Sequence, residues 1–396
     1  MEKDERLLKL IGDDMTSPNP NLPRAEQKHT LMRRAYSPSL TKQALKIQES
    51  VIIGHVNDLI EAVKARSAEP VDMVDMMCFV IYNSFSDLFL GESLNLFQDP
   101  TYVPWVHSFD SFAKGTTIMA ALQHYSIFLY ILPWLIKKYG AKKRDYFLDV
   151  IHGCFDRRVA SKTNKKDFLH FAMQEKNQLS VKDLRAFAPF LMIGGCETTP
   201  NLLSGLIFNL LNSKMSLELL RNEIRNAFGS DEEIVMDRMF ELKYLDACIQ
   251  ESSRLYASIG GGVDRMVPES GAMIAGQFVP GGTVVNVLHQ VTFITSRNFT
   301  RAEEFIPERW LPDARAEFGA DRKTAHRPFS VGPQSCFGQD LTFFVTRLIV
   351  SKLLWNYDLE LLPESKNWAD GQPSWTTRVK PPLMVKVTPF RDADTV

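Results

Sequence analysis

Cys336 has the surroundings in this chain that best suit chemistry at a sulfur atom. It lies between Gly332 and Gly338, and the residues after it have helical spacing, with apolar side chains at Leu341, Phe344, Val345, Leu348 and Ile349. Asp340 falls in the first predicted turn, where negative charge favours the helix dipole. A cysteine just before a helix N-terminus is stabilised as the thiolate, because backbone N–H groups point toward its sulfur. From the cysteine alone, an ordinary buried thiol is the alternative interpretation.

A second group of residues interrupts a long predicted helix. Gly194 and Gly195 each cost a helix about 1 kcal/mol relative to alanine, and Pro200 removes a hydrogen-bond donor. Such concentrated disruption favours a groove where a ligand lies against bare backbone, and a tolerated kink is the alternative. Glu197 and Thr198 lie in the same turn. A carboxyl and a hydroxyl at a widened turn can hold a water chain for proton transfer.

Two further pairs of residues share predicted helix faces. His29 and Arg33 are four residues apart, and a solvated basic helix is the simplest interpretation of them. Glu251 and Arg254 are three residues apart, so their side chains meet. Such a pair contributes little when it is exposed. Buried, it needs further partners or it destabilises the fold.

Helices must position most of these residues. Apolar spacing predicts helices over about 40–66, 71–95, 105–139, 181–212 and 216–229. After residue 259, glycine-rich breaks separate β-branched runs, which indicates short strands near 260–290 and 357–390. The sequence therefore predicts a mainly α fold with minor β.

The composition is that of a globular protein. The chain has 396 residues, 45% of them hydrophobic, and a formal net charge of −1, which gives no indication of a nucleic-acid partner. The five cysteines are scattered without CxxC spacing, so neither a disulfide framework nor a zinc site is predicted. A reducing compartment is expected.

The N-terminal residues are charged and contain no apolar run, so neither a secretory signal nor a transmembrane anchor is expected there. The most apolar stretch, 127–136, is too short to span a bilayer. Core packing and a peripheral membrane contact through residues 127–138 are the two interpretations of this region.

The pattern Phe-x-x-Gly-x-x-x-Cys-x-Gly, formed by Phe329, Gly332, Cys336 and Gly338, resembles the haem-ligand loop of the cytochrome P450 family. The motifs before it occur in that family's order: His-x-x-x-Arg, Gly-Gly-x-Glu-Thr, Glu-x-x-Arg and Pro-Glu-Arg. One position differs from the family's pattern: Gln334 occupies a position where the family usually has arginine or histidine. The resemblance extends from about residue 27 to the C-terminus.

The resemblance implies roles for particular residues. Cys336 would be the axial thiolate ligand of haem b, which favours O–O cleavage. Glu197 and Thr198 would help to deliver protons to dioxygen. The implied haem-binding residues are His29, Arg33, Arg265, Phe329 and Gly338. The implied structural triad is Glu251, Arg254 and Arg309.

The resemblance also implies a fold. We expect a single cytochrome P450-like haem domain over 1–396, helical from about 27 to 258. From about 259 to 396 we expect small strands, a meander, the cysteine loop and a final helix. Eukaryotic members have a membrane anchor and most of a β-sheet before the His-x-x-x-Arg helix, so the resemblance predicts an N-terminally shortened fold.

The implied function is that of a haem-thiolate monooxygenase, which inserts one oxygen atom from O2 into an apolar small-molecule substrate. NADPH would supply the electrons through a cytochrome P450 reductase. Lys323, Arg327 and Arg347 are candidate docking charges for it, and a solvated basic face is the alternative. The C-terminal sequence resembles fungal members of secondary-metabolite biosynthesis. The expected location is intracellular, at the surface of the endoplasmic reticulum membrane.

Two other functions are alternatives. One is a non-catalytic or inactive truncated haem protein. The other is a thiolate-haem isomerase or a peroxide-using enzyme, which would need no reductase. The Glu197–Thr198 pair argues against the second alternative, because such chemistry does not require dioxygen to be protonated.

Overall fold

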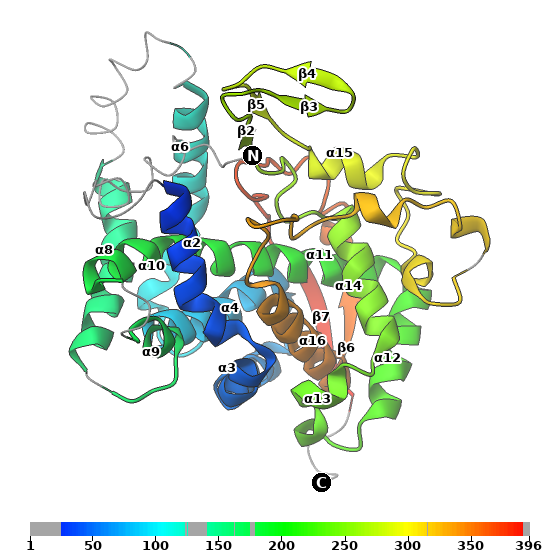
Figure 1. The fold of residues 1–396 in the computed structure, drawn as a ribbon. Helices are drawn as coiled ribbons and strands as arrows, with labels where there is room; N and C mark the ends of the chain where they lie inside the picture. Colours follow the sequence, from blue (N-terminus) through cyan, green and yellow to red (C-terminus); the bar gives the residue numbers. More distant parts are fainter. Residues whose placement is uncertain are drawn as a thin grey trace.

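Helices dominate the computed structural model, which describes residues 25–122, 125, 141–161, 163–174, 179–314 and 316–390. Two of them, α10 (Val181–Cys196) and α11 (Thr198–Asn212), follow one another across the middle of the molecule (Figure 1). The other longer helices are α2 (Ala25–Tyr36), α3 (Lys42–Arg66), α4 (Met73–Leu90), α6 (Phe109–Leu122), α8 (Ala141–Ala160), α12 (Lys214–Ala227), α14 (Lys243–Leu255) and α16 (Gln339–Asn356). The short helices are α5 (Val103–His107), α9 (Phe168–Ala172), α13 (Met236–Met239) and α15 (His289–Ile294).

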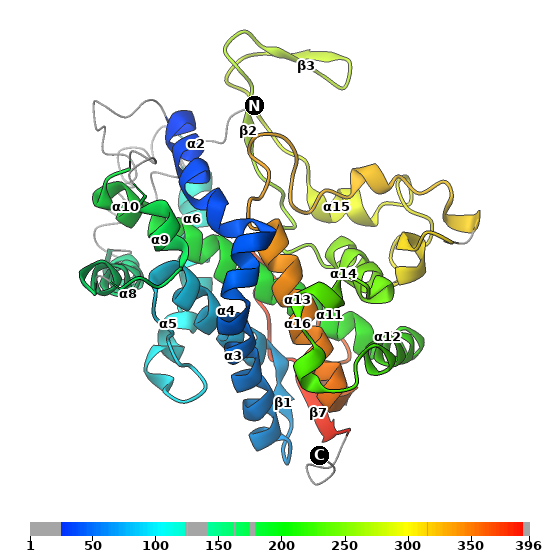
Figure 2. The same ribbon diagram turned by 60° about the horizontal axis from the view of Figure 1, so that its bottom comes forward.

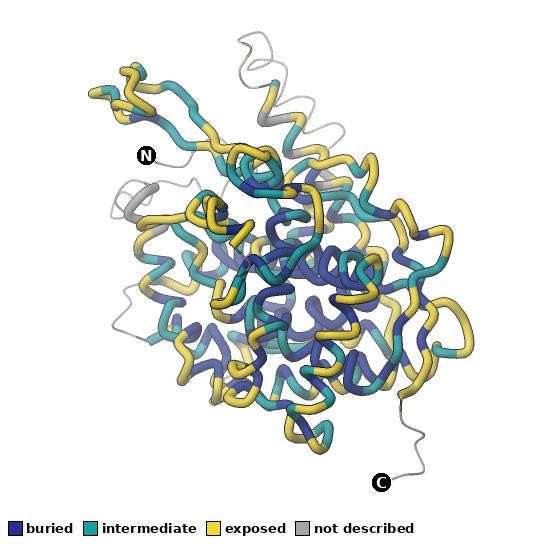
Figure 3. Tube along the Cα trace, turned by 90° about the vertical axis from the view of Figure 1, so that its right-hand side faces the viewer, coloured by how far each residue is buried: buried dark blue, intermediate teal, exposed yellow. Residues whose placement is uncertain are grey.

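The core lies where α3, α4, α11 and α16 pack together. Figure 3 shows buried residues gathered at the centre of the chain trace and exposed residues on its outside. The apolar face predicted after the cysteine loop is part of this core, because Leu341, Phe344 and Leu348 of α16 are buried. Burial of such side chains is the main favourable contribution to folding.

Helix α4 is long and apolar enough to cross a membrane, but 83% of this 18-residue stretch is buried inside the protein. The sequence predicted a helix over about 71–95, and the structure places α4 in the core. Residues 127–138, for which core packing and a peripheral membrane contact were the two interpretations, lie outside the residues that the structure describes.

The described strands form three small sheets. The first has the order β1-β7-β6 and joins β1 (Val71–Asp72) to β6 (Tyr357–Leu361) and β7 (Met384–Pro389), all antiparallel (Figure 2). The other two are the pairs of β2 (Arg265–Met266) with β5 (Val284–Val285) and of β3 (Ala272–Ile274) with β4 (Gln277–Val279). The strands predicted near 260–290 and 357–390 are therefore present.

The sequence did not predict β1. The Asp72 carboxylate accepts hydrogen bonds from the N–H groups of Val74 and Leu383, each at 2.9 Å. The Asp72 side chain thus caps the N-terminus of α4 and also attaches this helix to the C-terminal sheet.

Two predicted helices are interrupted in the structure. The helix predicted over 181–212 divides at Glu197 into α10 and α11. The segment predicted as helical from 105 is divided at Ser108, which lies between α5 and α6 and whose hydroxyl donates to the Trp105 carbonyl at 2.7 Å. Gly194, Gly195 and Pro200 predicted the disruption of the first segment, whereas the division at Ser108 was not predicted.

A buried ionic network joins α14 to the irregular chain after α15. Arg254 donates to both carboxylate oxygens of Glu251, at 2.7 and 2.9 Å. Arg309, from the 3-10 turn η7 (Pro307–Trp310), donates to the same carboxylate at 2.9 Å. All three side chains are fully buried. The implied triad is therefore assembled, and the structure adds Trp310 and Asp321, which bond to Glu251 and Arg309 respectively.

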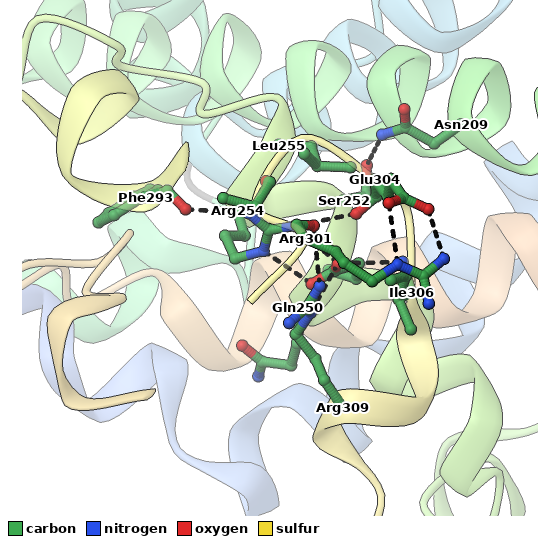
Figure 4. A network of polar contacts seen from close by, with 12 residues as sticks. Asn209, Gln250, Ser252, Arg254, Leu255, Phe293, Arg301, Glu304, Ile306 and Arg309 are labelled. Carbon is green, nitrogen blue, oxygen red and sulfur yellow. Dashed lines mark hydrogen bonds and ion pairs between the residues drawn. The ribbon is translucent and has the colours of Figure 1, made fainter. Parts of the chain in front are cut away.

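The two arginines of this network also bind backbone carbonyls. Arg254 donates to the carbonyls of Phe293 at 2.9 Å and Glu304 at 3.0 Å, and Figure 4 shows it within the network that includes Arg309. Arg309 donates to the Thr300 carbonyl at 3.0 Å. A segment with little regular structure is thus held in place by two cationic side chains.

Replacing Glu251 by alanine leaves Arg254 and Arg309 buried without their shared carboxylate. We expect the free energy of unfolding, measured by urea denaturation, to fall by about 3–5 kcal/mol. The control Glu304→Ala removes an exposed pair with Arg301 and should cost less than about 1 kcal/mol. Equal losses in the two variants would contradict the structural role of Glu251.

Candidate active site

The loop around Cys336 is fixed by its own backbone. The Cys336 N–H donates to the Phe329 carbonyl at 2.8 Å, and the Ser335 N–H donates to the Gly332 carbonyl at 3.0 Å. Gly332 has a φ of 80°, a left-handed conformation that favours glycine. The Cys336 side chain is exposed, and α16 begins directly after Gly338. The loop therefore presents the sulfur beside a helix N-terminus, as the sequence predicted.

Gly338 does not have the backbone requirement of Gly332. Its φ is −85°, which any residue adopts. A Cβ at this position would lie 3.8 Å from the Cys336 sulfur, an ordinary contact distance. A side chain at this position would therefore lie directly beside the sulfur. Glycine keeps space there for a ligand of the sulfur, and the conformation of the loop does not require it.

Two arginines approach the cysteine loop from different elements. Arg33 of α2 donates to the Ser335 carbonyl and lies 3.4 Å from the Ser335 hydroxyl. Arg265 of β2 donates to the Ser330 hydroxyl at 3.3 Å, and burial lowers the pKa of its guanidinium. Among the described residues, neither arginine lies within ion-pairing distance of a carboxylate. In the described part of the chain, both cations therefore lie near an exposed thiol without a direct ion pair, although the charge of Asp264 acts on Arg265.

Gln334 adds an unsatisfied polar group to the same loop. Its side-chain oxygen is buried, and no hydrogen-bond donor among the described residues contacts it. Buried polar atoms are usually satisfied, so such an atom indicates a missing partner. The exposed thiol and the two cations around one loop fit a haem, which offers an iron atom and two carboxylates. The Gln334 oxygen is an acceptor, so a haem carboxylate would not satisfy it.

His29 shares α2 with Arg33, one helical turn before it. The His29 side chain lies outside the part of the chain that the structure describes, so its implied contact with a haem propionate stays a prediction. The Phe329 ring packs on Phe343 of α16, with the ring centroids 5.2 Å apart. This contact attaches the start of the loop to the helix that follows it.

The two adjacent glycines of α10 face in different directions. A Cβ on Gly195 would lie 2.5 Å from the Phe85 ring of α4, so this glycine permits close helix packing. Gly194 is exposed, and a Cβ on it would meet nothing within 4 Å. The hydroxyl of Thr198 donates to the Gly194 carbonyl at 2.7 Å. Gly194 and Thr198 therefore form an open face of the helix break, and the ligand groove predicted there stays a prediction.

Glu197 lies on the opposite, buried side. The Tyr82 hydroxyl of α4 donates to its carboxylate. Burial raises the pKa of the Glu197 carboxyl to about 8, although the nearby charge of Lys380 and the Tyr82 bond oppose the increase. Glu197 is thus largely protonated at neutral pH, while the Thr198 hydroxyl lies on the open face. The two residues implied in proton delivery are therefore adjacent in the sequence, but the side chain of Glu197 is buried and that of Thr198 lies on the open face.

The connection between α14 and β2 contacts both groups of site residues. The Ser258 hydroxyl donates to the Thr198 carbonyl at 2.9 Å. At the end of this connection, Arg265, the first residue of β2, donates to the Ser330 hydroxyl in the cysteine loop. The helix break and the cysteine loop therefore border the same segment of chain.

Sequence reasoning missed three contacts at this site. Tyr82 belongs to a helix rich in Met and Phe, and no local signal distinguishes it from its core neighbours. Ser330 and Ser335 are small polar residues in a glycine-containing loop, where such residues are common. Only the long-range contacts with Glu197, Arg265 and Arg33 identify these residues.

Comparison with known proteins agrees with this geometry. The model of the family described as Cytochrome P450 matches residues 18–387. The cytochrome P450 monooxygenase aneG of Aspergillus aculeatus is 34% identical over 362 residues, covering 90% of this chain and 68% of that protein. The cytochrome P450 monooxygenase astA of Talaromyces wortmannii is 35% identical over 379 residues, covering 94% of this chain and 76% of that protein.

A solved structure supports the fold. The crystal structure of the cytochrome P450DA heme domain matches 98% of this chain and 82% of its own, with a TM-score of 0.79 and 17% sequence identity. The predicted mainly α fold with minor β is therefore confirmed as a cytochrome P450 fold. With the family model and the curated relatives, this places the chain in the cytochrome P450 family of haem-dependent oxidoreductases.

Proposed function

We propose that this chain is a haem-thiolate monooxygenase that inserts one oxygen atom from O2 into an apolar small molecule. The observation that carries the proposal is the exposed Cys336 thiol at a helix N-terminus, flanked by Arg33 and Arg265. Cys336 would hold the iron of haem b, and the two arginines would bind its propionates. Haem bound through a thiolate supplies the cleavage of the O–O bond.

The helix break would serve proton delivery. Glu197 is largely protonated at neutral pH, so it can release a proton without first taking one from solvent. The Thr198 hydroxyl lies on the open face, where it can pass a proton on through water. Because the two side chains face different directions, transfer between them requires a water molecule or a rotation of the Glu197 side chain.

An apolar substrate agrees with the surface near the site. Val331 of the cysteine loop is 63% exposed, and Val287, which follows β5, is 61% exposed. Exposed apolar side chains near a candidate site favour an apolar ligand. Relatives named as monooxygenases from Aspergillus and Talaromyces support a role in fungal secondary-metabolite biosynthesis.

Electrons would come from an NADPH-dependent cytochrome P450 reductase. Lys323 and Arg327 line a surface groove of about 490 Å³ between α14 and η7, where they can meet an acidic partner. Arg347 is less available, because it bonds to Asp246 at 2.6 Å and its guanidinium lies 5.2 Å from the centroid of the Phe343 ring. A location at the surface of the endoplasmic reticulum membrane follows from the family resemblance and is part of this proposal.

The ligand assignment is tested by the spectrum of the reduced, carbon-monoxide-bound protein. The wild-type chain should give the strongly red-shifted Soret band of a thiolate-ligated haem. Cys336→Ala should lose this band, and the control Cys196→Ala, which removes a buried thiol of α10, should keep it. If wild type lacks the band, the monooxygenase proposal is wrong. If the band forms without NADPH-dependent product, the monooxygenase proposal is wrong, and the chain is either a non-catalytic haem protein or an isomerase or peroxide-using enzyme that needs no reductase.

The role of Thr198 is tested by coupling, the ratio of product formed to NADPH consumed. Thr198→Ala removes the hydroxyl on the open face, so coupling should fall about tenfold or more while NADPH is still consumed. The control Thr199→Ala removes a buried hydroxyl of the adjacent residue and should leave coupling unchanged. Unchanged coupling in Thr198→Ala would exclude Thr198 from proton delivery.

The docking surface is tested with the double variant Lys323→Glu and Arg327→Glu. Reversing both charges should raise the KM for the reductase about tenfold at low salt, and the effect should shrink as ionic strength increases. The control Lys142→Glu reverses an exposed charge on α8 and should have no effect. A KM that does not respond to the double variant would place docking elsewhere.

A further inference from the structure

Tyr82 is a buried tyrosine to which the proposed mechanism gives no role. It is 2% exposed on α4, and its hydroxyl donates to the Glu197 carboxylate. Its ring packs edge-on against Trp105, with the centroids 5.5 Å apart. Trp105 stacks on Phe147 at 5.2 Å and donates to the Phe147 carbonyl at 3.1 Å. The hydroxyl is therefore held in one position by three packed aromatic side chains.

The position of Glu197 makes this contact important. Glu197 is the residue between α10 and α11, and its own carbonyl accepts a hydrogen bond from the Asn201 side chain at 2.9 Å. Among the described residues, Tyr82 is the only hydrogen-bond donor to its carboxyl group. The backbone at the break is thus held by Asn201, and the direction of the side chain is set by Tyr82.

The other titratable groups around this carboxyl differ in the sign of their effect on it. Lys380, in the segment before β7, favours the carboxylate, and Asp110 of α6 disfavours it. His107 of α5 acts on Asp110. The remaining titratable groups that act on this cluster are Cys78 and Asp75 of α4 and Cys196 of α10. Tyr82 is the member of this set that bonds directly to the carboxyl.

We propose that Tyr82 is a positioning residue for oxygen activation, which holds the Glu197 carboxyl on the α4 side of the helix break and stabilises the carboxylate after it releases a proton. This inference rests on the proposed monooxygenase function. The proton leaves Glu197 toward the Thr198 side, the Tyr82 O–H remains intact and bonds to the carboxylate, and a proton from solvent restores the acid. Tyr82 thus lowers the energy of the deprotonated state without itself titrating.

The variant Tyr82→Phe tests this directly. It removes the donor to the carboxylate, so Glu197 should hold its proton to higher pH. We expect the infrared C=O band of the protonated carboxyl, identified by its loss in Glu197→Gln, to titrate about one pH unit higher than in wild type. The alkaline limit of coupled product formation should move in the same direction, with the substrate KM unchanged.

Tyr357→Phe is the matched control. It also removes a buried hydroxyl, which donates to the Ile60 carbonyl at 2.8 Å and does not contact Glu197. The titration of Glu197 should not move in this variant. A second measurement remains available if Tyr82→Phe does not fold. Replacing tyrosine by 3-fluorotyrosine makes the phenol a stronger hydrogen-bond donor. The titration of Glu197 should then move to lower pH.

The outcomes separate this inference from the proposed function. The infrared titration follows a carboxyl group and does not require turnover. An unchanged titration midpoint in both folded Tyr82→Phe and the fluorinated protein would overturn the role of Tyr82, even if the thiolate spectrum is intact. Absence of the thiolate spectrum would overturn the monooxygenase proposal whatever the midpoint is.

Discussion

The buried carboxylate of Glu251 is the interaction on which the rest of the structure depends. It accepts hydrogen bonds from two arginines and from the Trp310 ring N–H, with every partner buried or half-buried. Arg254 and Arg309 in turn bind the carbonyls of a segment that has no long helix or strand. Such an arrangement stabilises only when all its donors and acceptors are satisfied, because a buried charge without a partner is strongly destabilising. The cysteine loop follows this segment in the sequence, so the network helps to place Cys336 beside α16.

The arginines of the site have different surroundings from those of the network. Arg254 and Arg309 are paired with carboxylates, whereas Arg33 and Arg265 bond to serine oxygens and to backbone carbonyls. A half-buried cation with only neutral acceptors is less stable than a paired one. The absence of carboxylate partners at Arg33 and Arg265 in the described residues is explained if a bound cofactor supplies two carboxylates. Burial raises the pKa of the Glu197 carboxyl to about 8, which agrees with the proton-delivery role proposed for it.

Much of the site could be predicted because its chemistry is local in sequence. The glycine at 332 and the apolar spacing after Cys336 predicted a loop followed by a helix, and the Glu251–Arg254 spacing predicted a pair. Glu197 was predicted to lie at a disrupted turn, and the helix divides there. The Tyr82 contact, the two-residue strand β1 and the attachment of Arg33 to Ser335 could not be predicted. They depend on segments far apart in the sequence, and no periodic pattern records such contacts. The break at Ser108 was missed for a different reason, since the helical spacing of apolar residues continues past the residue where α5 ends.

The central claim is that Cys336 and the two arginines are arranged to hold a haem. A crystal structure of the haem-loaded protein tests this most directly. The account predicts that the Cys336 sulfur is bonded to iron, and that Arg33 and Arg265 have exchanged their contacts with Ser335 and Ser330 for the haem carboxylates. Iron bonded to a different residue, or arginines that remain on the two serines with the haem carboxylates elsewhere, would contradict it.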